Sequence, residues 1–107
     1  MSFIQIMTAT ETKEQAEVIA RSLIEAHLAA CVQITGGIES TYRWRGKVEY
    51  SNECLCLIKT REDLFDEVAA VIKKLHSYDT PEIIAVPIIA GSPEYLAWLA
   101  ETLPESR

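Results

Sequence analysis

Cys54 and Cys56 stand two residues apart in an apolar run that is typical of a β-strand. Side chains at this spacing project from the same face of a strand, so the two thiols could bind a soft metal ion such as Cu(I) or contribute to a zinc site. Tetrahedral zinc needs further ligands, however, and no histidine is near them in sequence. Free cysteine also packs as a small apolar residue in protein cores. We therefore interpret both thiols, together with Cys31, as core residues.

Each of the two histidines ends a predicted helix. His76 follows the second predicted helix, where an imidazole could bind a metal ion or carry a proton. A histidine at a helix C-terminus also has a structural explanation, because the helix dipole stabilises its protonated form. From the spacing alone this explanation is favoured for His76, and it applies equally to His27 at the end of the first helix.

The tyrosines and tryptophans each combine an apolar ring with a polar atom: Tyr42, Trp44, Tyr50, Tyr78, Tyr95 and Trp98. Such side chains are frequent at interfaces and in ligand clefts. We expect the first three, near a predicted hairpin, to form a subunit contact, whereas Tyr78 and Trp98 could belong to the core. Glu53 and Lys59, on one predicted strand, could serve a polar cleft or be solvated charges.

Motifs and net charge exclude several classes of function. No nucleophile elbow, zinc-protease helix, P-loop or dinucleotide-binding motif occurs. Acidic residues number 16 against 10 basic ones, for a net charge of −6. Nucleic-acid binding needs a basic surface to neutralise phosphates, so no nucleic-acid partner is expected. The apolar run at residues 83–90 is far shorter than the ~20 residues of a membrane-spanning helix, so no membrane partner is expected either.

Composition indicates a folded chain in a reducing compartment. Of the 107 residues, 49% are hydrophobic, which is incompatible with intrinsic disorder. The three cysteines are an odd number and contain no CxxC pair, which favours reduced thiols. The N-terminus carries no signal-peptide pattern. These features predict a cytoplasmic location.

Hydrophobic spacing predicts alternating strands and helices. Strands are expected at residues 3–7, 31–34 with a continuation from 38 to 44, 48–58 and 83–90, and amphipathic helices at 16–28, 64–75 and 93–103. Pro87 cannot donate to a sheet, so the last strand should lie at an edge or be bulged. The order βαββαβ plus a C-terminal helix is typical of an α+β, ferredoxin-like fold with one antiparallel sheet and helices on one face. Residues 1–107 are expected to form a single domain.

Local signals mark a hairpin and the helix starts. Gly36 and Gly37 predict a bulge or bend, and residues 45–46 predict a hairpin turn. The resulting long, bent hairpin exceeds what the helices of one domain can cover, so part of it is expected to pair outside the monomer. Thr12 and Gln15 have capping-box spacing, residues 60–63 repeat this signal, and Ser92 precedes a proline at the start of the last helix.

Several motifs, in order along the chain, resemble the CutA family of divalent-cation tolerance proteins. They are residues 28–32, 37–49, 58–60, 76–83, 87–88, 91–92 and 95–99. The resemblance implies a ferredoxin-like subunit, similar to PII signalling proteins, that assembles as a homotrimer by pairing its long hairpin strands between subunits. It also implies tolerance of copper and other divalent ions, and no established catalytic activity. The residues it places at clefts between subunits are Tyr42, Trp44, Glu53, Lys59, Tyr78 and Trp98.

The copper site of the family carries over only in part. Its bacterial pattern has a cysteine in the first strand and two consecutive histidines after the second helix. Here Met7 and Leu75 occupy two of those positions, which leaves His76 as the candidate metal ligand. Loss of a thiolate and an imidazole should weaken Cu(II) binding.

The leading hypothesis is a non-enzymatic, cytoplasmic homotrimer that binds divalent metal ions such as copper or supports tolerance of them. The alternative is a PII-like signalling module that binds a small molecule or a protein partner in clefts between subunits. A third hypothesis is an enzyme that uses a cleft carboxylate such as Glu53. The sequence shows no set of residues that would activate such a carboxylate for catalysis.

Overall fold

The computed structural model describes residues 2–106, and its order of elements confirms the predicted α+β plan. The elements are β1 (Phe3–Thr10), α1 (Lys13–Glu25), β2 (Cys31–Trp44), β3 (Lys47–Arg61), a 3-10 turn (Glu62–Leu64), α2 (Phe65–Leu75), β4 (Ile84–Pro87) and α3 (Pro93–Thr102). No helix in the described part of the chain is long and apolar enough to cross a membrane.

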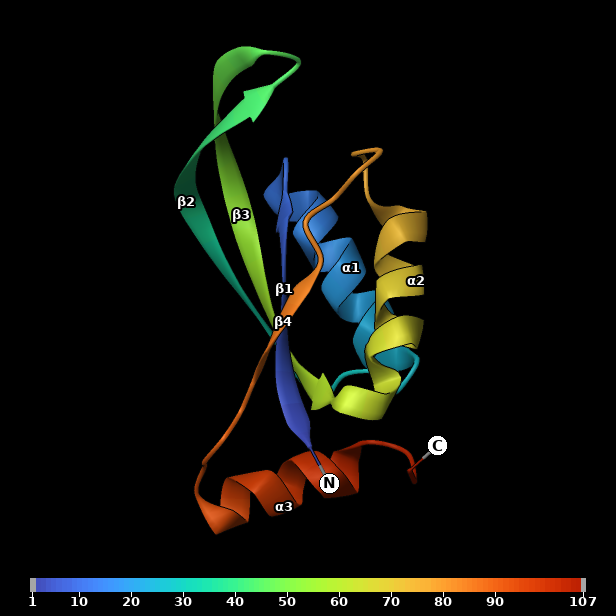
Figure 1. Cartoon of the computed structure of the whole chain (residues 1–107). Coiled ribbons are helices and arrows are strands. Elements are labelled where there is room, and N and C mark those ends of the chain that lie inside the picture. The colour runs from blue at the N-terminus through green and yellow to red at the C-terminus, as the bar shows by residue number, and fades with distance from the viewer. Residues whose placement is uncertain (1, 107) are drawn as a thin grey trace.

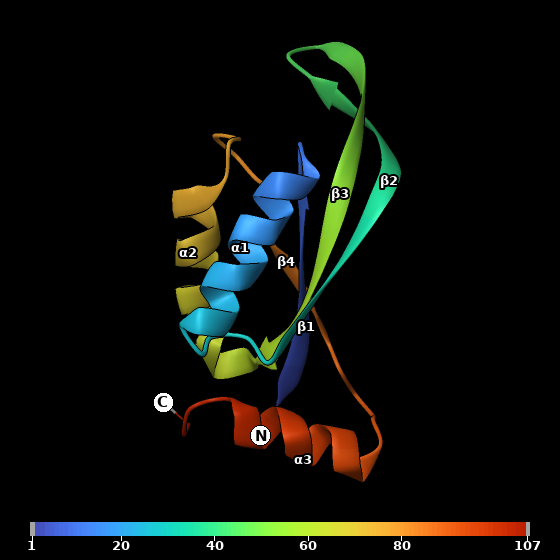
Figure 2. The ribbon, with the colours of Figure 1, turned by 180° about the vertical axis from the view of Figure 1, so that it is seen from behind.

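The strands form one antiparallel sheet in the order β2-β3-β1-β4. Helices α1 and α2 cover one face of it, and α3 crosses the end of the sheet where β1 begins (Figures 1 and 2). Buried positions alternate along β1 from Phe3 to Thr8 because successive side chains point to opposite faces of a strand, and the last three residues are all buried. The core lies between sheet and helices and includes Ile6, Ile19, Leu23, Ile58, Leu64, Val68 and Ile72, and it is joined by Leu99 of α3 and by Leu103 just after that helix.

The β2–β3 hairpin extends well past the rest of the sheet (Figure 1). The pairing of β1 with β3 ends at Cys54, so residues 47–53 have only β2 as a neighbour. The register shifts between Thr35 and Ile38, where Gly37 has φ 72°, and the turn at Arg45 and Gly46 has positive φ at both residues. These features confirm the predicted bulge and the predicted turn.

Strand β4 is shorter than predicted but lies at the edge, as Pro87 indicated. It pairs only with β1, from Ile84 opposite Met7 to Pro87 opposite Ile4. The next backbone N–H, of Ile88, still reaches Phe3 O at 3.0 Å. Because β1 begins there, the last residues of the predicted strand have no partner, and the prediction of a strand to residue 90 is wrong.

The first capping prediction is half correct. The Thr12 hydroxyl accepts from Gln15 N–H at 3.1 Å, as predicted. The Gln15 side chain does not return to the start of its own helix. Its Nε2 donates to Leu75 O at 3.4 Å and its Oε1 accepts from the Ser77 hydroxyl at 3.1 Å, so Gln15 ties α1 to the segment that follows α2.

The capping prediction for residues 60–63 is wrong. The Thr60 hydroxyl is buried and donates to Leu28 O at 2.6 Å, because Thr60 faces the helix layer as part of β3. The 3-10 turn precedes α2, which begins without a side-chain cap. At α3 the prediction holds: Ser92 Oγ accepts from Tyr95 N–H at 3.3 Å, with Pro93 in the first turn.

The core interpretation of the thiols is confirmed for Cys56, holds in part for Cys54, which packs against the core, and is wrong for Cys31, which lies outside the core cluster. All three cysteines are free, and Cys56 is fully buried, whereas Cys31 and Cys54 are half-buried. Burial, followed by the charge of the neighbouring Cys54, raises the pKa of Cys56 to about 11. Cys56 therefore remains a protonated, apolar side chain at neutral pH.

Candidate functional site

An open groove of about 790 Å³ lies between the β2–β3 hairpin and the loop of residues 78–82. Figure 1 shows this loop and the hairpin on either side of the C-terminal end of β1. The groove is lined by Ala9, Ser40, Thr41, Tyr42, Trp44, Glu53, Tyr78, Asp79, Thr80, Pro81 and Glu82. It therefore combines parts of the chain that are far apart in sequence.

His76 fixes the loop that forms one wall of the groove. The imidazole is 9% exposed, and its Nε2 lies 2.8 Å from Ala9 O. Its Nδ1 accepts from Tyr78 N–H at 3.1 Å. A nitrogen that accepts this bond carries no proton, so Nε2 is the donor to Ala9 and the ring is neutral. His76 thus joins the 78–82 loop to the end of β1.

Glu53 and Tyr78 meet across the groove. The Tyr78 hydroxyl donates to Glu53 Oε2 at 2.9 Å. Glu53 is only 9% exposed, and among residues 2–106 its carboxylate has no ion-pair partner. Burial, followed by the hydrogen bond to Glu53 and the charge of that carboxylate, raises the pKa of Tyr78 to about 12. Tyr78 therefore remains a hydrogen-bond donor across the physiological pH range.

The walls of the groove are acidic and aromatic. Asp79 and Glu82 add two carboxyl groups to that of Glu53, and no described lysine, arginine or histidine lines the groove. Tyr42 and Trp44 are 44% and 50% exposed. Carboxylates attract positive charge, and aromatic faces attract cations through the ring quadrupole. The arrangement suits a positively charged group that also has apolar surface.

The structure brings together only part of the cleft predicted from the sequence. Tyr42, Trp44, Glu53 and Tyr78 all line the groove. Lys59 lies elsewhere on β3, paired with Gln5 and Cys31 in the sheet, and its ammonium group donates to Gln33 Oε1.

Trp98 is also outside the groove, on α3. Its ring stacks beside Tyr95 with ring centroids 5.6 Å apart, and it is 43% exposed rather than in the core.

Sequence reasoning missed Asp79 and Glu82 as lining residues. Both follow Tyr78 within the motif of residues 76–83, and the turn-forming pair Thr80 and Pro81 separates them. A cluster of acidic residues next to an aromatic one within a single turn was the available signal. Their proximity to Glu53 depends on the His76 contact to Ala9, which no local pattern predicts.

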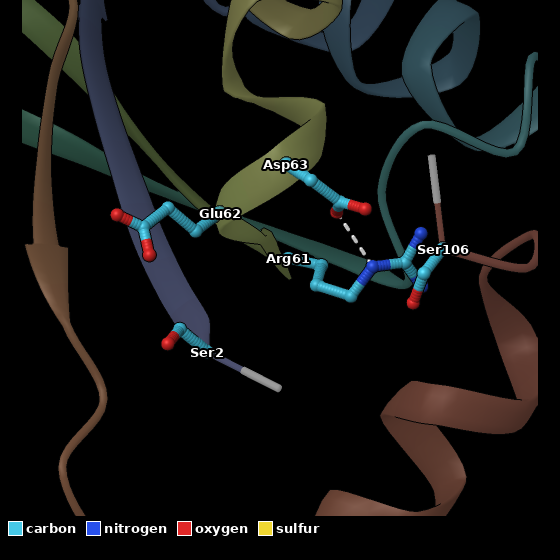
Figure 3. Close-up of a pocket in the computed structure, with 5 residues that line it drawn as sticks. All are labelled: Ser2, Arg61, Glu62, Asp63 and Ser106. Carbon is cyan, nitrogen blue, oxygen red and sulfur yellow. Dashed lines mark hydrogen bonds and ion pairs between the residues drawn. The ribbon is translucent and has the colours of Figure 1, made fainter.

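A second, smaller pocket lies at the far end of β3 and has a structural explanation. It is lined by Ser2, Arg61, Glu62, Asp63 and Ser106 (Figure 3). Arg61 is 2% exposed, and its Nε donates to Asp63 Oδ1 at 2.6 Å. Its other two nitrogens donate to Pro104 O at 2.8 Å and Glu105 O at 3.3 Å. Arg61 therefore anchors the C-terminal segment, and each of its three guanidinium nitrogens already has a partner within the chain.

Comparison with known proteins identifies the family. Residues 4–102 match the family described as CutA1 divalent ion tolerance protein. This chain belongs to the CutA family. It is 46% identical over 103 residues to protein CutA 1, chloroplastic, of Oryza sativa subsp. japonica, which covers 96% of this chain and 58% of the relative. The chain thus spans less than two thirds of that relative.

Two further comparisons support membership of the CutA family. The divalent-cation tolerance protein CutA of Thermus thermophilus is 44% identical over 96 residues, covering 90% of this chain and 93% of that protein. The crystal structure of CutA1 from Oryza sativa has a TM-score of 0.95 at 44% identity, covering 99% of this chain and 97% of that one. The ferredoxin-like expectation drawn from the CutA resemblance is therefore confirmed at the level of the fold.

The residues at the copper-ligand positions that the CutA resemblance implies, Met7, Leu75 and His76, do not form a metal-binding site within this chain. Both ring nitrogens of His76 already have hydrogen-bond partners. Met7 lies on β1 opposite Leu57 and Ile84, and Leu75 supplies only a backbone carbonyl, to Gln15. Within residues 2–106, no group of at least three histidine, cysteine or acidic side chains is arranged to hold a metal ion. The residues present therefore do not fit a copper site within one subunit.

Proposed function

We propose that this CutA protein acts as a homotrimer in tolerance of divalent metal ions, and that it does not catalyse a reaction. The observation that carries the proposal is the unpartnered hairpin. Residues 41–50 are all exposed, including Tyr42, Trp44, Val48 and Tyr50, the last at 76%. Long exposed strands with large apolar side chains tend to associate, which supports a partner for the hairpin.

The other end of the sheet offers a matching edge. Strand β4 pairs only with β1, so its outer edge is open, and Ile84 and Val86 are largely exposed. A hairpin that pairs with an edge strand of the next copy is a head-to-tail contact, which closes into a ring when the rotation allows. A ring of three is the assembly that the CutA resemblance implies.

Family membership supports the tolerance role, and the chemistry of the chain supports cations as its partners. Relatives are named as divalent-cation tolerance proteins rather than as enzymes. The net charge of −6 attracts cations to the surface. Copper binding by His76 would require an ion to displace Tyr78 N–H from Nδ1 or Ala9 O from Nε2, so we propose that bound ions take ligands from more than one subunit.

Native mass spectrometry of the metal-stripped protein, titrated with Cu(II) or Zn(II), tests both the homotrimer and the binding of ions by it. The expected result is a trimer that takes up ions at a fixed ratio to subunits, and His76→Asn should lower uptake if His76 contributes. His27→Asn is the matched control, because His27 is exposed and its φ of 57° suits asparagine. A monomer would contradict the assembly, and a trimer that takes up neither ion would contradict direct ion binding.

The groove favours a second candidate function. A PII-like signalling module would bind a small molecule or a protein partner in clefts between subunits, and a groove of about 790 Å³ with a buried carboxylate has the size of a small-molecule site. A thermal-shift screen over metabolite classes tests it, because a ligand that binds only the folded protein raises its melting temperature. A screen with no shift in any class would contradict this candidate.

We propose a cytoplasmic location on the basis of the free thiols. All three cysteines are free. The rice relative is named as chloroplastic, so a fluorescent fusion expressed in the native host is the appropriate measurement. Fluorescence confined to an organelle or to the periplasm would contradict the proposal of a cytoplasmic location.

A further inference from the structure

We propose that the groove binds an organic ammonium ion, with the Glu53 carboxylate neutralising its charge and the rings of Tyr42 and Trp44 covering its apolar groups. This inference rests on the second candidate function, that the groove holds a small molecule, and it names the chemical class of that molecule.

The first observation is the incomplete set of partners around Glu53. The side chain is 91% buried, because its exposed fraction is 9%. One oxygen, Oε2, accepts from the Tyr78 hydroxyl, and Oε1, which is open to the groove rather than sealed in the core, has no hydrogen-bond partner among the described residues. A buried carboxylate without a counter-charge is costly. A cation in the groove would supply the missing partner.

The second observation is the aromatic wall that faces this carboxylate from the hairpin. Tyr42 and Trp44 line the groove and are about half exposed. Trp44 already attracts a cation within the chain, since the Arg45 guanidinium carbon lies 5.4 Å from its ring centroid. Aromatic rings beside an acidic group form the usual site for ammonium ions with apolar substituents.

The same geometry argues against two other classes of ligand. An anion would face Glu53, Asp79 and Glu82, with no basic residue of the same subunit lining the groove, and Lys59 of that subunit lies elsewhere. A hard divalent ion takes six or more oxygen ligands, and the three carboxyl groups are not arranged as a metal-binding cluster. An organic cation needs only one carboxylate and an apolar surface.

The groove is also held in shape before any ligand enters. Tyr78 fixes the orientation of the Glu53 carboxylate, and His76 fixes the backbone of Tyr78. Groups held in place by the protein lose little conformational freedom on binding, which favours affinity.

Choline and its neutral isostere 3,3-dimethylbutan-1-ol are the probes that test the inference, because they differ in charge but hardly in shape. Binding of each is measured by calorimetry on the assembled wild-type protein. We expect saturable binding of choline and roughly tenfold or weaker binding of the neutral alcohol. Equal binding of the two probes, or no binding of choline, would overturn the inference.

Two variants locate the binding site. Glu53→Gln keeps the shape and removes the charge, and should weaken choline binding by roughly tenfold. Glu101→Gln, on the exposed surface of α3, makes the same change in charge and should leave binding unaltered. If Glu53→Gln fails to fold, as judged by circular dichroism, the comparison of the two probes on the wild-type protein still decides.

A metabolite screen separates failure of the inference from failure of the proposed function. If an anion such as ATP or inorganic phosphate binds and choline does not, the groove has a small-molecule ligand and only the inferred class is wrong. If no class binds, the second candidate function fails together with the inference.

Discussion

Glu53 and Arg61 are both buried charged residues on β3, and they differ in how completely their charges are satisfied. Arg61 has an ion pair with Asp63 and two backbone carbonyls. Glu53 has one hydroxyl group, that of Tyr78, and faces a groove. Arg61 has a partner on each guanidinium nitrogen and anchors the fold, whereas Glu53 keeps one carboxylate oxygen without a hydrogen-bond partner among the described residues. This difference in partners motivates the proposal that the groove at Glu53 binds a ligand, whereas the pocket at Arg61 has a structural explanation.

Replacing Arg61 should have the largest effect on stability. Arg61→Ala removes the ion pair and both bonds to the C-terminal segment, so the free energy of unfolding should fall by about 3 kcal/mol. Chemical denaturation at fixed protein concentration measures the change, with Arg43→Ala on the exposed hairpin as the control. A loss below about 1 kcal/mol, the scale of a surface ion pair, would show that Arg61 does not anchor the segment.

Replacing Glu53 should change stability in the opposite direction. Glu53→Gln removes an unneutralised buried charge but retains an acceptor for Tyr78, so the free energy of unfolding should rise by about 1 kcal/mol. The same denaturation experiment measures it. Destabilisation comparable to that of Arg61→Ala would mean that Glu53 has a structural role and would remove the contrast.

The ionisation of Tyr78 reports on the same pair. Its pKa of about 12 is raised by burial first and by Glu53 second, so folding favours the protonated hydroxyl. This stabilisation is complete below pH 10, the ordinary tyrosine value, and is lost as pH rises through about 12. Absorbance titration, with Tyr78→Phe to assign the signal, should show a lower pKa in Glu53→Gln that still exceeds 10. A pKa unchanged by Glu53→Gln would mean that the hydrogen bond does not form.

The smallest expected effect concerns thiol reactivity along β3. Burial raises the pKa of Cys56 to about 11, so at pH 8 almost no thiolate is present, and the thiolate is the reactive form. Iodoacetamide should modify Cys56 more slowly than the half-buried Cys31, as peptide mass spectrometry can measure. Equal rates at the two sites would indicate that the core opens readily around Cys56.

The order of elements was predictable because it follows from local spacing. The alternation of strands and helices, the bulge at Gly37, the turn at Gly46 and the edge position of Pro87 each depend on residues close together in sequence. Patterns of this kind determine backbone conformation directly, so the α+β plan could be obtained without coordinates.

Contacts between distant segments could not be predicted in this way. Thr60 and Gln15 have the residue types of helix caps, yet their side chains bond to Leu28 and Leu75 in the folded chain. Lys59 and Glu53 lie on one strand, but only Glu53 reaches the groove. Which charge is buried and which partner it meets depends on tertiary packing, and local patterns do not contain that information.

The most direct test of the central claim is the ¹³C chemical shift of the Glu53 carboxylate, followed while choline is added to protein labelled at glutamate. The signal is assigned by its loss in Glu53→Gln. We expect a saturable shift at Glu53, with the exposed carboxylate of Glu101 unchanged. A Glu53 signal that does not move while choline binds, or that moves no more than that of Glu101, would contradict the central claim.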